Sequence, residues 1–406
     1  MSDFYQNGIV TTLHNLSSRP LQNMEDELER FALNRPLGLI LPCLYSELET
    51  EAMPKILEEL QRVNYLNQIV IGLDRATESH YRKAIKFFSG LSVAPEIVWN
   101  DGPRLRAIDR KLSEVNLSPE EQGKGRNVWF CMGLTLASRK VEAVAMHDCD
   151  ILTYERGLLA RLIYPVANPN FNYQFCKGFY ARVANGKMNG RVSRLLVTPL
   201  LRSLKKVCGP MEFIEYLDSY RYPLAGEFSF RRDVMNDIRI PSDWGLEIGV
   251  LSEMTRNYST KRLCQVDIAD NYDHKHQNLS AEDNKSGLSK MSIDITKAIF
   301  RKLATNGMIF NKESFRTIKA TYFRVALDFV ESYRHDAEIN GLTLDIDEEE
   351  RSVELFAKNI MEAGESFLDN PMETPFIPSW TRVNSALPEL QYELMKAVQD
   401  DMEEFS

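Results

Sequence analysis

Two carboxylates, Asp148 and Asp150, flank Cys149 directly after the apolar run VEAVAM at 141–146. If that run is a strand, residues two apart point the same way, so both carboxylates face one side. Paired carboxylate oxygens hold hard divalent cations, and such a cation can hold a diphosphate. The triplet also fits a solvated turn or a helix N-cap. Its position at the end of a buried run favours a cation and diphosphate site.

Two basic segments could bind anions. Lys124 stands between glycines in GKG (123–125), where the backbone can approach a ligand and the ammonium supplies a point charge. The segment GRVSR (190–194) places an arginine and a hydroxyl near a predicted helix start, which suits a phosphate or carboxylate. A flexible turn and an ordinary amphipathic helix are the alternative interpretations of the two segments.

Further polar groups follow later in the chain. Glu227 and Glu247 each lie close to a glycine, and such carboxylates can orient sugar hydroxyls or act in catalysis. Glu247 also fits a helix first turn, where an acid is favourable. His274 and His276 lie in DNYDHKHQNL and are candidate metal ligands, with a solvated polar loop as the alternative.

The elements that would position these groups alternate between strands and helices. Apolar runs predict buried strands at 37–41, 68–73, 96–99 and 141–146, and helical spacing occurs at 47–63, 78–90 and 125–139. Such alternation is typical of an α/β fold of Rossmann type, with a mostly parallel sheet flanked by helices. Ligands bind such sheets at the carboxyl ends of the strands. We expect four parts: a lead-in (1–36), two halves (37–170 and 171–288) and a helical C-terminal extension (289–406).

Composition narrows the class of protein. The net charge of −9 argues against a broad nucleic-acid surface, so an anionic ligand needs a local basic cluster. The six cysteines are scattered without a C-x-x-C pair, which excludes zinc-knuckle spacing. The N-terminus MSDFYQNGIV predicts no signal peptide, and no window approaches the ~20 apolar residues that span a bilayer. We expect a soluble cytoplasmic enzyme with reduced thiols.

A series of short motifs carries a more specific signal. In order, they are LPCLYSE (41–47), GLD (72–74), GKG (123–125), HDCD (147–150), KGFYAR (177–182), GRVSRLLVTPLL (190–201), YPLAGEFSFRR (222–232), WGLEIGVL (244–251) and HKHQNL (274–279). This series resembles the retaining glycosyltransferases that make glucosyl-3-phosphoglycerate, which have the A-type glycosyltransferase fold. The resemblance covers about residues 37–280. The chain departs from the family pattern at Cys43, Ala225 and Tyr272, and it has Ser193 where threonine is usual.

The resemblance implies a role for each matched residue. Residues 37–170 would bind the nucleotide sugar and 171–288 the acceptor. The donor would be bordered or contacted by Pro42, Leu44, Glu47, Asp74, Lys124, Asp148 and the backbone of Cys149. The metal, Mg²⁺ or Mn²⁺, would be held by Asp150 and His274. The acceptor would be held by Lys177, Gly190, Arg191, Val192 and Ser193, with Arg191 and Ser193 on its phosphate. Glu227 and Glu247 would face the transferred sugar as catalytic residues.

The implied reaction moves glucose from a nucleoside diphosphate glucose to the 2-hydroxyl of 3-phosphoglycerate, with retention of configuration. Three alternatives stay open: a mannosyl donor, a glycerate or related hydroxy-acid acceptor, and a non-catalytic sugar-nucleotide sensor whose acidic tail binds a partner. We also expect a homodimer without nucleic-acid or membrane partners. The sequence does not decide whether the extension packs on its own chain or on a second subunit.

Overall fold

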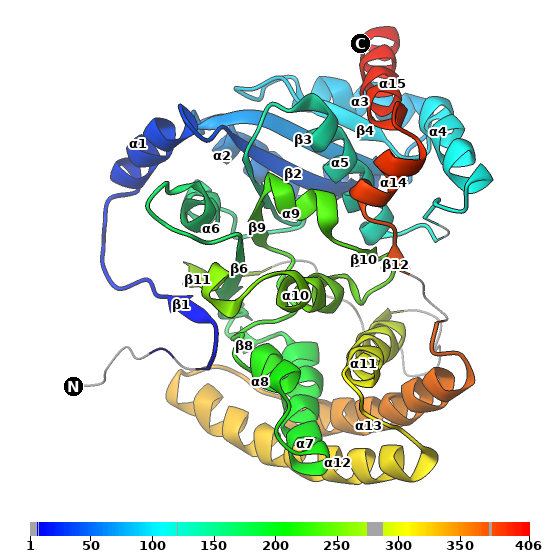
Figure 1. Ribbon diagram of the computed structural model, residues 1–406. Coiled ribbons are helices and arrows are strands. Elements are labelled where there is room, and N and C mark those ends of the chain that lie inside the picture. The colour runs from blue at the N-terminus through cyan, green and yellow to red at the C-terminus, as the bar shows by residue number, and fades with distance from the viewer. Residues whose placement is uncertain (1–5, 7, 120, 274–286, 373–375) are drawn as a thin grey trace.

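The chain is built around one large mixed sheet (Figure 1). The computed structural model describes residues 6, 8–119, 121–273, 287–372 and 376–406. Within these residues the main sheet has eight strands in the order β1-β11-β6-β9-β5-β2-β3-β4. The strands are β1 (Thr11–Leu13), β2 (Leu37–Leu44), β3 (Leu66–Asp74), β4 (Glu96–Trp99), β5 (Ala143–Met146), β6 (Phe175–Tyr180), β9 (Phe228–Arg231) and β11 (Leu263–Ala269).

Strand β9 runs against the rest of the sheet. It pairs antiparallel with β5 and β6, whereas the pairs β1–β11, β11–β6, β5–β2, β2–β3 and β3–β4 are parallel. The start of β9 therefore lies at the edge where its neighbours β5 and β6 end. The prediction of a mostly parallel sheet is confirmed.

Two apolar cores lie on the two faces of the sheet. Along β2, Ile40 packs into one core while Leu39 and Leu41 pack into the other, as the alternation of side chains along a strand requires. Strands covered on both faces read as continuous apolar runs, which is why the predicted strands are found. The helices of this part are α1 (Leu21–Ala32), α2 (Ala52–Leu60), α3 (Glu78–Phe88), α4 (Pro103–Glu114), α5 (Lys124–Ser138), α6 (Arg156–Ala167), α7 (Thr198–Cys208), α8 (Glu212–Asp218), α9 (Arg232–Asp237) and α10 (Leu246–Asn257).

Shorter elements complete the inventory. The hairpin strands are β7 (Val183–Ala184) and β8 (Lys187–Met188), and a second small pair joins β10 (Ile240–Pro241) to β12 (Phe376–Ile377). Short helical segments are the 3₁₀ helices η1 (Tyr45–Glu49) and η3 (Thr260–Arg262) and the wider π-helical η2 (Val192–Val197). Strand β1 and helices α4 and α6 do not follow from the sequence pattern. β1 is a three-residue strand at the edge of the sheet, and so short a run carries almost no periodic signal.

The C-terminal extension is helical, as predicted, and packs on its own chain. Its helices are α11 (Gly287–Thr305), α12 (Lys312–Ile339), α13 (Ile346–Asp369), α14 (Trp380–Ala386) and α15 (Leu390–Phe405). Helices α12 and α13 lie beside α7 at one end of the molecule, whereas α15 packs near α3, α4 and β4 at the other (Figure 1). The indole rings of Trp380 and Trp129 stack with centroids 4.2 Å apart and tie α14 to α5. None of the helices in the described ranges has the length and apolar character needed to cross a bilayer.

Candidate active site

The reversed direction of β9 brings Asp148 and Glu227 to one edge of the sheet. Met146 at the end of β5 pairs with Phe228 at the start of β9, so the residues following one strand oppose those preceding the other. Gly226 makes this approach possible, because a Cβ there would lie 2.4 Å from Asp148 Oδ2. Any larger residue at position 226 must displace the Asp148 carboxylate.

Lys124 joins two of the predicted carboxylates. Its Nζ lies 2.6 Å from Asp148 Oδ1 and 3.1 Å from Glu247 Oε1. Burial disfavours the charged ammonium, but the two carboxylates outweigh it and raise the pKa of Lys124. Lys124 begins α5 and Glu247 lies in the first turn of α10, so one lysine connects the starts of two helices.

The glycines of GKG have a packing role. A Cβ on Gly125 would lie 2.1 Å from the carbonyl oxygen of Pro241, and one on Gly123 would lie 2.7 Å from that of Ser242. The start of α5 therefore presses directly on the backbone of 241–242, which leads into α10. This close approach places Lys124 within reach of Glu247, so the flexible-turn interpretation of GKG is wrong.

Glu227 is fully buried and held by two tyrosines. Its carboxylate accepts hydrogen bonds from Tyr180 Oη at 2.6 Å and from Tyr272 Oη at 2.5 Å. The two phenol rings stack with centroids 3.6 Å apart. Burial and then the charge of Asp148 raise the pKa of Glu227 despite these hydrogen bonds. Sequence reasoning did not assign the tyrosines, although Tyr180 lies inside the motif KGFYAR and Tyr272 is one of the departures from the family pattern.

The predicted donor residues lie along the ends of β2 and β3. Leu44 and Asp74 are paired neighbours at the carboxyl ends of these strands, and Glu47 follows in η1. Burial raises the pKa of Asp74 although its carboxylate accepts a hydrogen bond from the Arg75 amide. A hydrogen bond with Cys43 and burial raise the pKa of the Cys149 thiol well above its usual value. Cys149 is thus protonated, which fits a spacer and not a nucleophile.

One predicted metal ligand lies in the described part of the chain. Asp150 follows β5 and is half-buried, and a carboxylate is a type of oxygen ligand that hard cations prefer. His274 and His276 lie outside the described residues. Within the described ranges no group of three or more His, Cys, Asp or Glu side chains is arranged to hold a metal. A carboxylate such as that of Asp150 is suited to Mg²⁺ or Mn²⁺, and the pairing of Asp150 with His274 on a metal stays a prediction.

The predicted acceptor segment, residues 190–194, forms the first turn of the helix that runs through η2 into α7, and we call it the acceptor turn. Gly190 has φ +78°, a conformation that side chains other than glycine rarely adopt, and Val192 and Ser193 follow in η2. The Asn189 amide, next to Gly190, donates to the Arg182 carbonyl at 2.8 Å, and the Arg182 guanidinium donates to Tyr222 Oη at 3.4 Å. The Tyr222 ring lies against Tyr180 with centroids 5.1 Å apart. This series of contacts connects the segment to Glu227.

Two predicted acceptor residues have protein partners. Arg191 forms ion pairs with Glu348 and Glu349 of the extension. Lys177 is fully buried in β6, and its ammonium donates to the carbonyl of Ala225. Its place beneath the surface suits support of the 225–227 turn, and direct acceptor binding by Lys177 stays a prediction.

Comparison with known proteins identifies the family of the chain. No family model matches the chain. It is 44% identical over 401 residues to a glucosyl-3-phosphoglycerate synthase of Persephonella marina, covering 99% of each chain. It is 38% identical over 408 residues to one of Methanococcoides burtonii, again covering 99% of each. The chain belongs to the glucosyl-3-phosphoglycerate synthase family.

Solved structures give the same fold. A Mycobacterium tuberculosis glucosyl-3-phosphoglycerate synthase in complex with Mg²⁺ and UDP matches with a TM-score of 0.53 at 20% identity, over 73% of this chain and 87% of that one. A mannosyl-3-phosphoglycerate synthase of Rubrobacter xylanophilus matches with a TM-score of 0.53 at 19% identity, over 74% and 83%. The predictions of the family, the fold class and a glycosyltransferase are confirmed.

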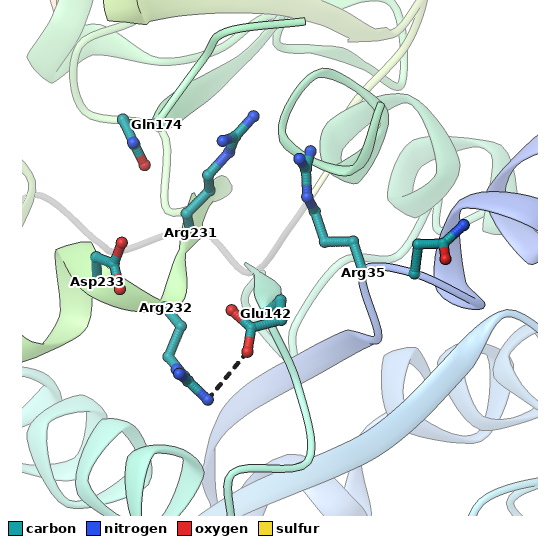
Figure 2. Close-up of a pocket in the computed structure, with 7 residues that line it drawn as sticks. Arg35, Glu142, Gln174, Arg231, Arg232 and Asp233 are labelled. Atoms are coloured by element: carbon teal, nitrogen blue, oxygen red, sulfur yellow. Dashed lines mark ion pairs between the residues drawn. The ribbon is translucent and has the colours of Figure 1, made fainter. Parts of the chain in front are cut away.

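A hollow of about 380 Å³ opens at the opposite ends of the strands from the predicted site (Figure 2). It is lined from the amino ends of parallel strands and the end of the reversed β9, by Asn34, Arg35, Glu142, Gln174, Arg231, Arg232 and Asp233. Arg232 and Glu142 form an ion pair of 3.1 Å across it. None of the predicted family residues lines this hollow.

Proposed function

We propose that this chain transfers glucose from a nucleoside diphosphate glucose to the 2-hydroxyl of 3-phosphoglycerate, with retention and with Mg²⁺ or Mn²⁺. The main support is the 44% identity to the Persephonella marina enzyme over 99% of both chains. The convergence of Lys124, Asp148, Glu227 and Glu247 at one sheet edge adds to it. A solved Mycobacterium tuberculosis enzyme holds Mn²⁺, UDP-glucose and phosphoglyceric acid.

The protein groups divide the work between donor and acceptor. The ends of β2 and β3, with Asp74 and Lys124, bind and orient the nucleotide sugar, and the 190–193 turn holds the acceptor phosphate. Holding the acceptor hydroxyl and the donor sugar close together and correctly oriented supplies much of the rate acceleration. A divalent cation, when bound at Asp150 and His274, neutralises charge growing on the leaving diphosphate.

The proposed reaction retains the configuration at the anomeric carbon of glucose, although the described residues of the site include no obvious protein nucleophile that could form a covalent intermediate. Glu227 is buried and hydrogen-bonded by two tyrosines, and Asp148 is paired with Lys124. We therefore propose that the acceptor hydroxyl attacks from the face that the diphosphate leaves. Its proton passes to the departing diphosphate oxygen, and Glu227 and Glu247 orient the sugar.

The test is turnover of purified protein with a panel of nucleotide sugars and acceptors. We expect glucosyl-3-phosphoglycerate with an α-linkage by NMR from an α-linked glucose donor. A product with inverted linkage would contradict retention. Transfer of mannose faster than glucose would favour the mannosyl alternative. Use of unphosphorylated glycerate as well as 3-phosphoglycerate would favour the glycerate alternative. Nucleotide binding without turnover on any acceptor would favour the sensor.

The metal assignment has its own experiment. Asp150→Ala should abolish the dependence of turnover on added Mg²⁺ or Mn²⁺ and lower activity by at least about a hundredfold, as expected for loss of charge stabilisation at the diphosphate. Activity near that of the wild type would remove Asp150 from the metal site.

Division of labour, assembly and location complete the proposal. We propose that residues 37–170 bind the donor and 171–288 the acceptor. We propose a cytoplasmic homodimer, and the absence of disulfides among the six cysteines supports a reducing compartment. Size-exclusion chromatography with light scattering measures the molar mass of the protein in solution and so tests the dimer. A monomeric mass would refute it.

A further inference from the structure

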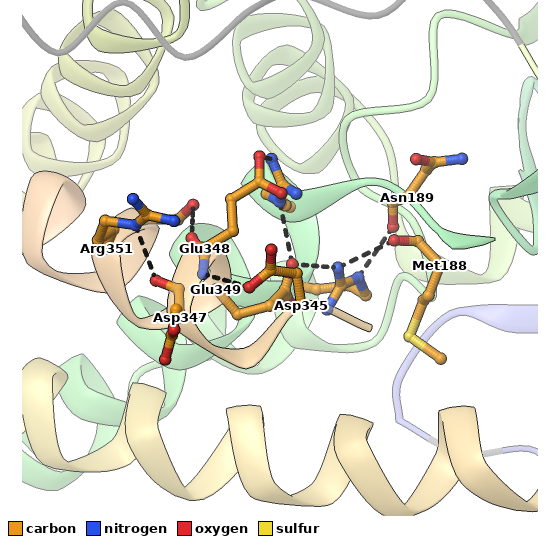
Figure 3. Close-up of polar contacts among 10 residues, drawn as sticks. Met188, Asn189, Asp345, Asp347, Glu348, Glu349 and Arg351 are labelled. Carbon is orange, nitrogen blue, oxygen red and sulfur yellow. Dashed lines mark hydrogen bonds and ion pairs between the residues drawn. The ribbon is translucent and has the colours of Figure 1, made fainter. Parts of the chain in front are cut away.

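The acidic run at 345–350 meets the acceptor turn at the start of α13 (Figure 3). Glu349 in this run is 1% exposed and accepts from two arginines of the turn. Its Oε1 lies 2.9 Å from Arg191 Nε and 3.1 Å from Arg194 Nη2, and its Oε2 lies 2.7 Å from Arg194 Nη1. One buried carboxylate thus fixes both guanidinium groups.

Arg194 in turn holds the shape of the turn. Its Nε donates to the carbonyl of Asn189 at 2.8 Å, and its guanidinium lies 4.7 Å from the centre of the Tyr333 ring. The Thr343 amide donates to the Gly186 carbonyl at 2.7 Å, close by in the hairpin. The extension therefore clamps the segment from 186 to 194 through backbone and side chain together.

Glu348 makes a different kind of contact. Its carboxylate is 34% exposed and lies 2.7 Å from Arg191 Nη1. Exposed ion pairs contribute little net stability, because water solvates the separated charges well. A buried, multiply bonded carboxylate such as Glu349 is costly to unpair. The two neighbouring glutamates therefore differ in how easily each can leave Arg191.

We propose that Glu349 is a positioning residue that aims Arg191 at the acceptor phosphate, while Glu348 occupies the place on Arg191 that the phosphate takes. This inference rests on the proposed function. A guanidinium can bond one anion through Nε and another through its outer nitrogens. Acceptor binding then exchanges the Glu348 carboxylate for a more highly charged phosphate, and Glu349 stays in place. The extension is thus part of the acceptor site.

Adjacent substitutions give opposite expected results. Glu349→Gln should raise the KM for 3-phosphoglycerate about tenfold with a smaller change in kcat and in the donor KM, because Arg191 loses its fixed orientation. Glu348→Gln should lower that KM about two- to threefold, because the phosphate no longer displaces a carboxylate. Glu350→Gln removes the same charge from an exposed neighbour on α13 and should change neither constant.

Two further measurements separate positioning from folding and from the function itself. Thermal unfolding of each variant reports stability, and Glu349→Asp, which keeps the charge, should recover part of the acceptor affinity. An unchanged acceptor KM in Glu349→Gln, or a raised KM in Glu348→Gln, would overturn the inference. If Glu349→Gln does not fold, the Glu348→Gln result still decides. Failure of wild-type protein to glucosylate 3-phosphoglycerate would instead refute the proposed function.

Discussion

Lys124→Met would test the electrostatic centre of the site. Methionine keeps a long unbranched side chain of similar bulk but removes the ammonium, so Asp148 and Glu247 lose the cation between them. Each carboxylate lies close to Nζ, at 2.6 Å and 3.1 Å. The substitution leaves two neighbouring negative charges to face a donor that is itself negatively charged.

The expected loss of electrostatic stabilisation in Lys124→Met can be worked out from these two distances. With an effective dielectric constant of about 20, a pair of charges 2.6 Å apart attracts by about 6 kcal/mol before desolvation. Desolvation offsets much of this, and breaking a buried pair costs about 3–5 kcal/mol. Lys124 and Asp148 are 30% and 31% exposed, so screening reduces the expected loss to about 2–3 kcal/mol. If the cation acts on the transition state, kcat/KM falls about 30- to 150-fold.

The assay is release of the nucleoside diphosphate at subsaturating donor. Lys140→Met is a matched control, because Lys140 is 52% exposed and pairs with Glu96 at 2.9 Å at the amino ends of β5 and β4. The control should stay within about twofold of the wild type, as an exposed pair contributes little. A Lys124→Met enzyme within threefold of the wild type, with the same melting temperature, would refute the electrostatic reasoning.

Three further predictions follow from other parts of the molecule. Gly226→Ala should reduce donor turnover at least about tenfold and lower stability by about 1–3 kcal/mol, since its Cβ meets Asp148 at 2.4 Å; wild-type kinetics would contradict this. Burial lowers the pKa of Lys177 to about 8 despite Glu247 and Glu227, so between pH 8 and about 10.4 the unfolded chain binds a proton that the folded chain lacks. The unfolding free energy of the wild type should therefore rise across this window by ~3 kcal/mol relative to Lys177→Met, and parallel pH profiles would exclude the shift. Trp380→Ala should cost about 3–5 kcal/mol in urea unfolding, because the fully buried indole stacks on Trp129; a loss below about 1 kcal/mol would show that the extension does not stabilise the sheet.

Local patterns in the sequence determined the alternating elements and the residues at their ends. Buried strands such as β2 and β3 are short apolar runs, and the groups after them, including Asp74 and Asp148, must lie at the carboxyl edge of a parallel sheet. The order of motifs then identified the family. These features depend on residues that are neighbours along the chain, so they can be predicted from one sequence alone.

Only the tertiary structure decided which of these groups meet. The reversal of β9 places Glu227 beside Asp148, and the pressing of GKG onto residues 241–242 puts Lys124 within reach of Glu247. The two tyrosines on Glu227 and the pairing of Arg191 with the extension join segments 45 to 158 residues apart. Such contacts depend on strand direction and helix packing, which no local spacing encodes. The ion pairs of Glu349, in the acidic run at 345–350, with Arg191 and Arg194 likewise depend on where α13 packs.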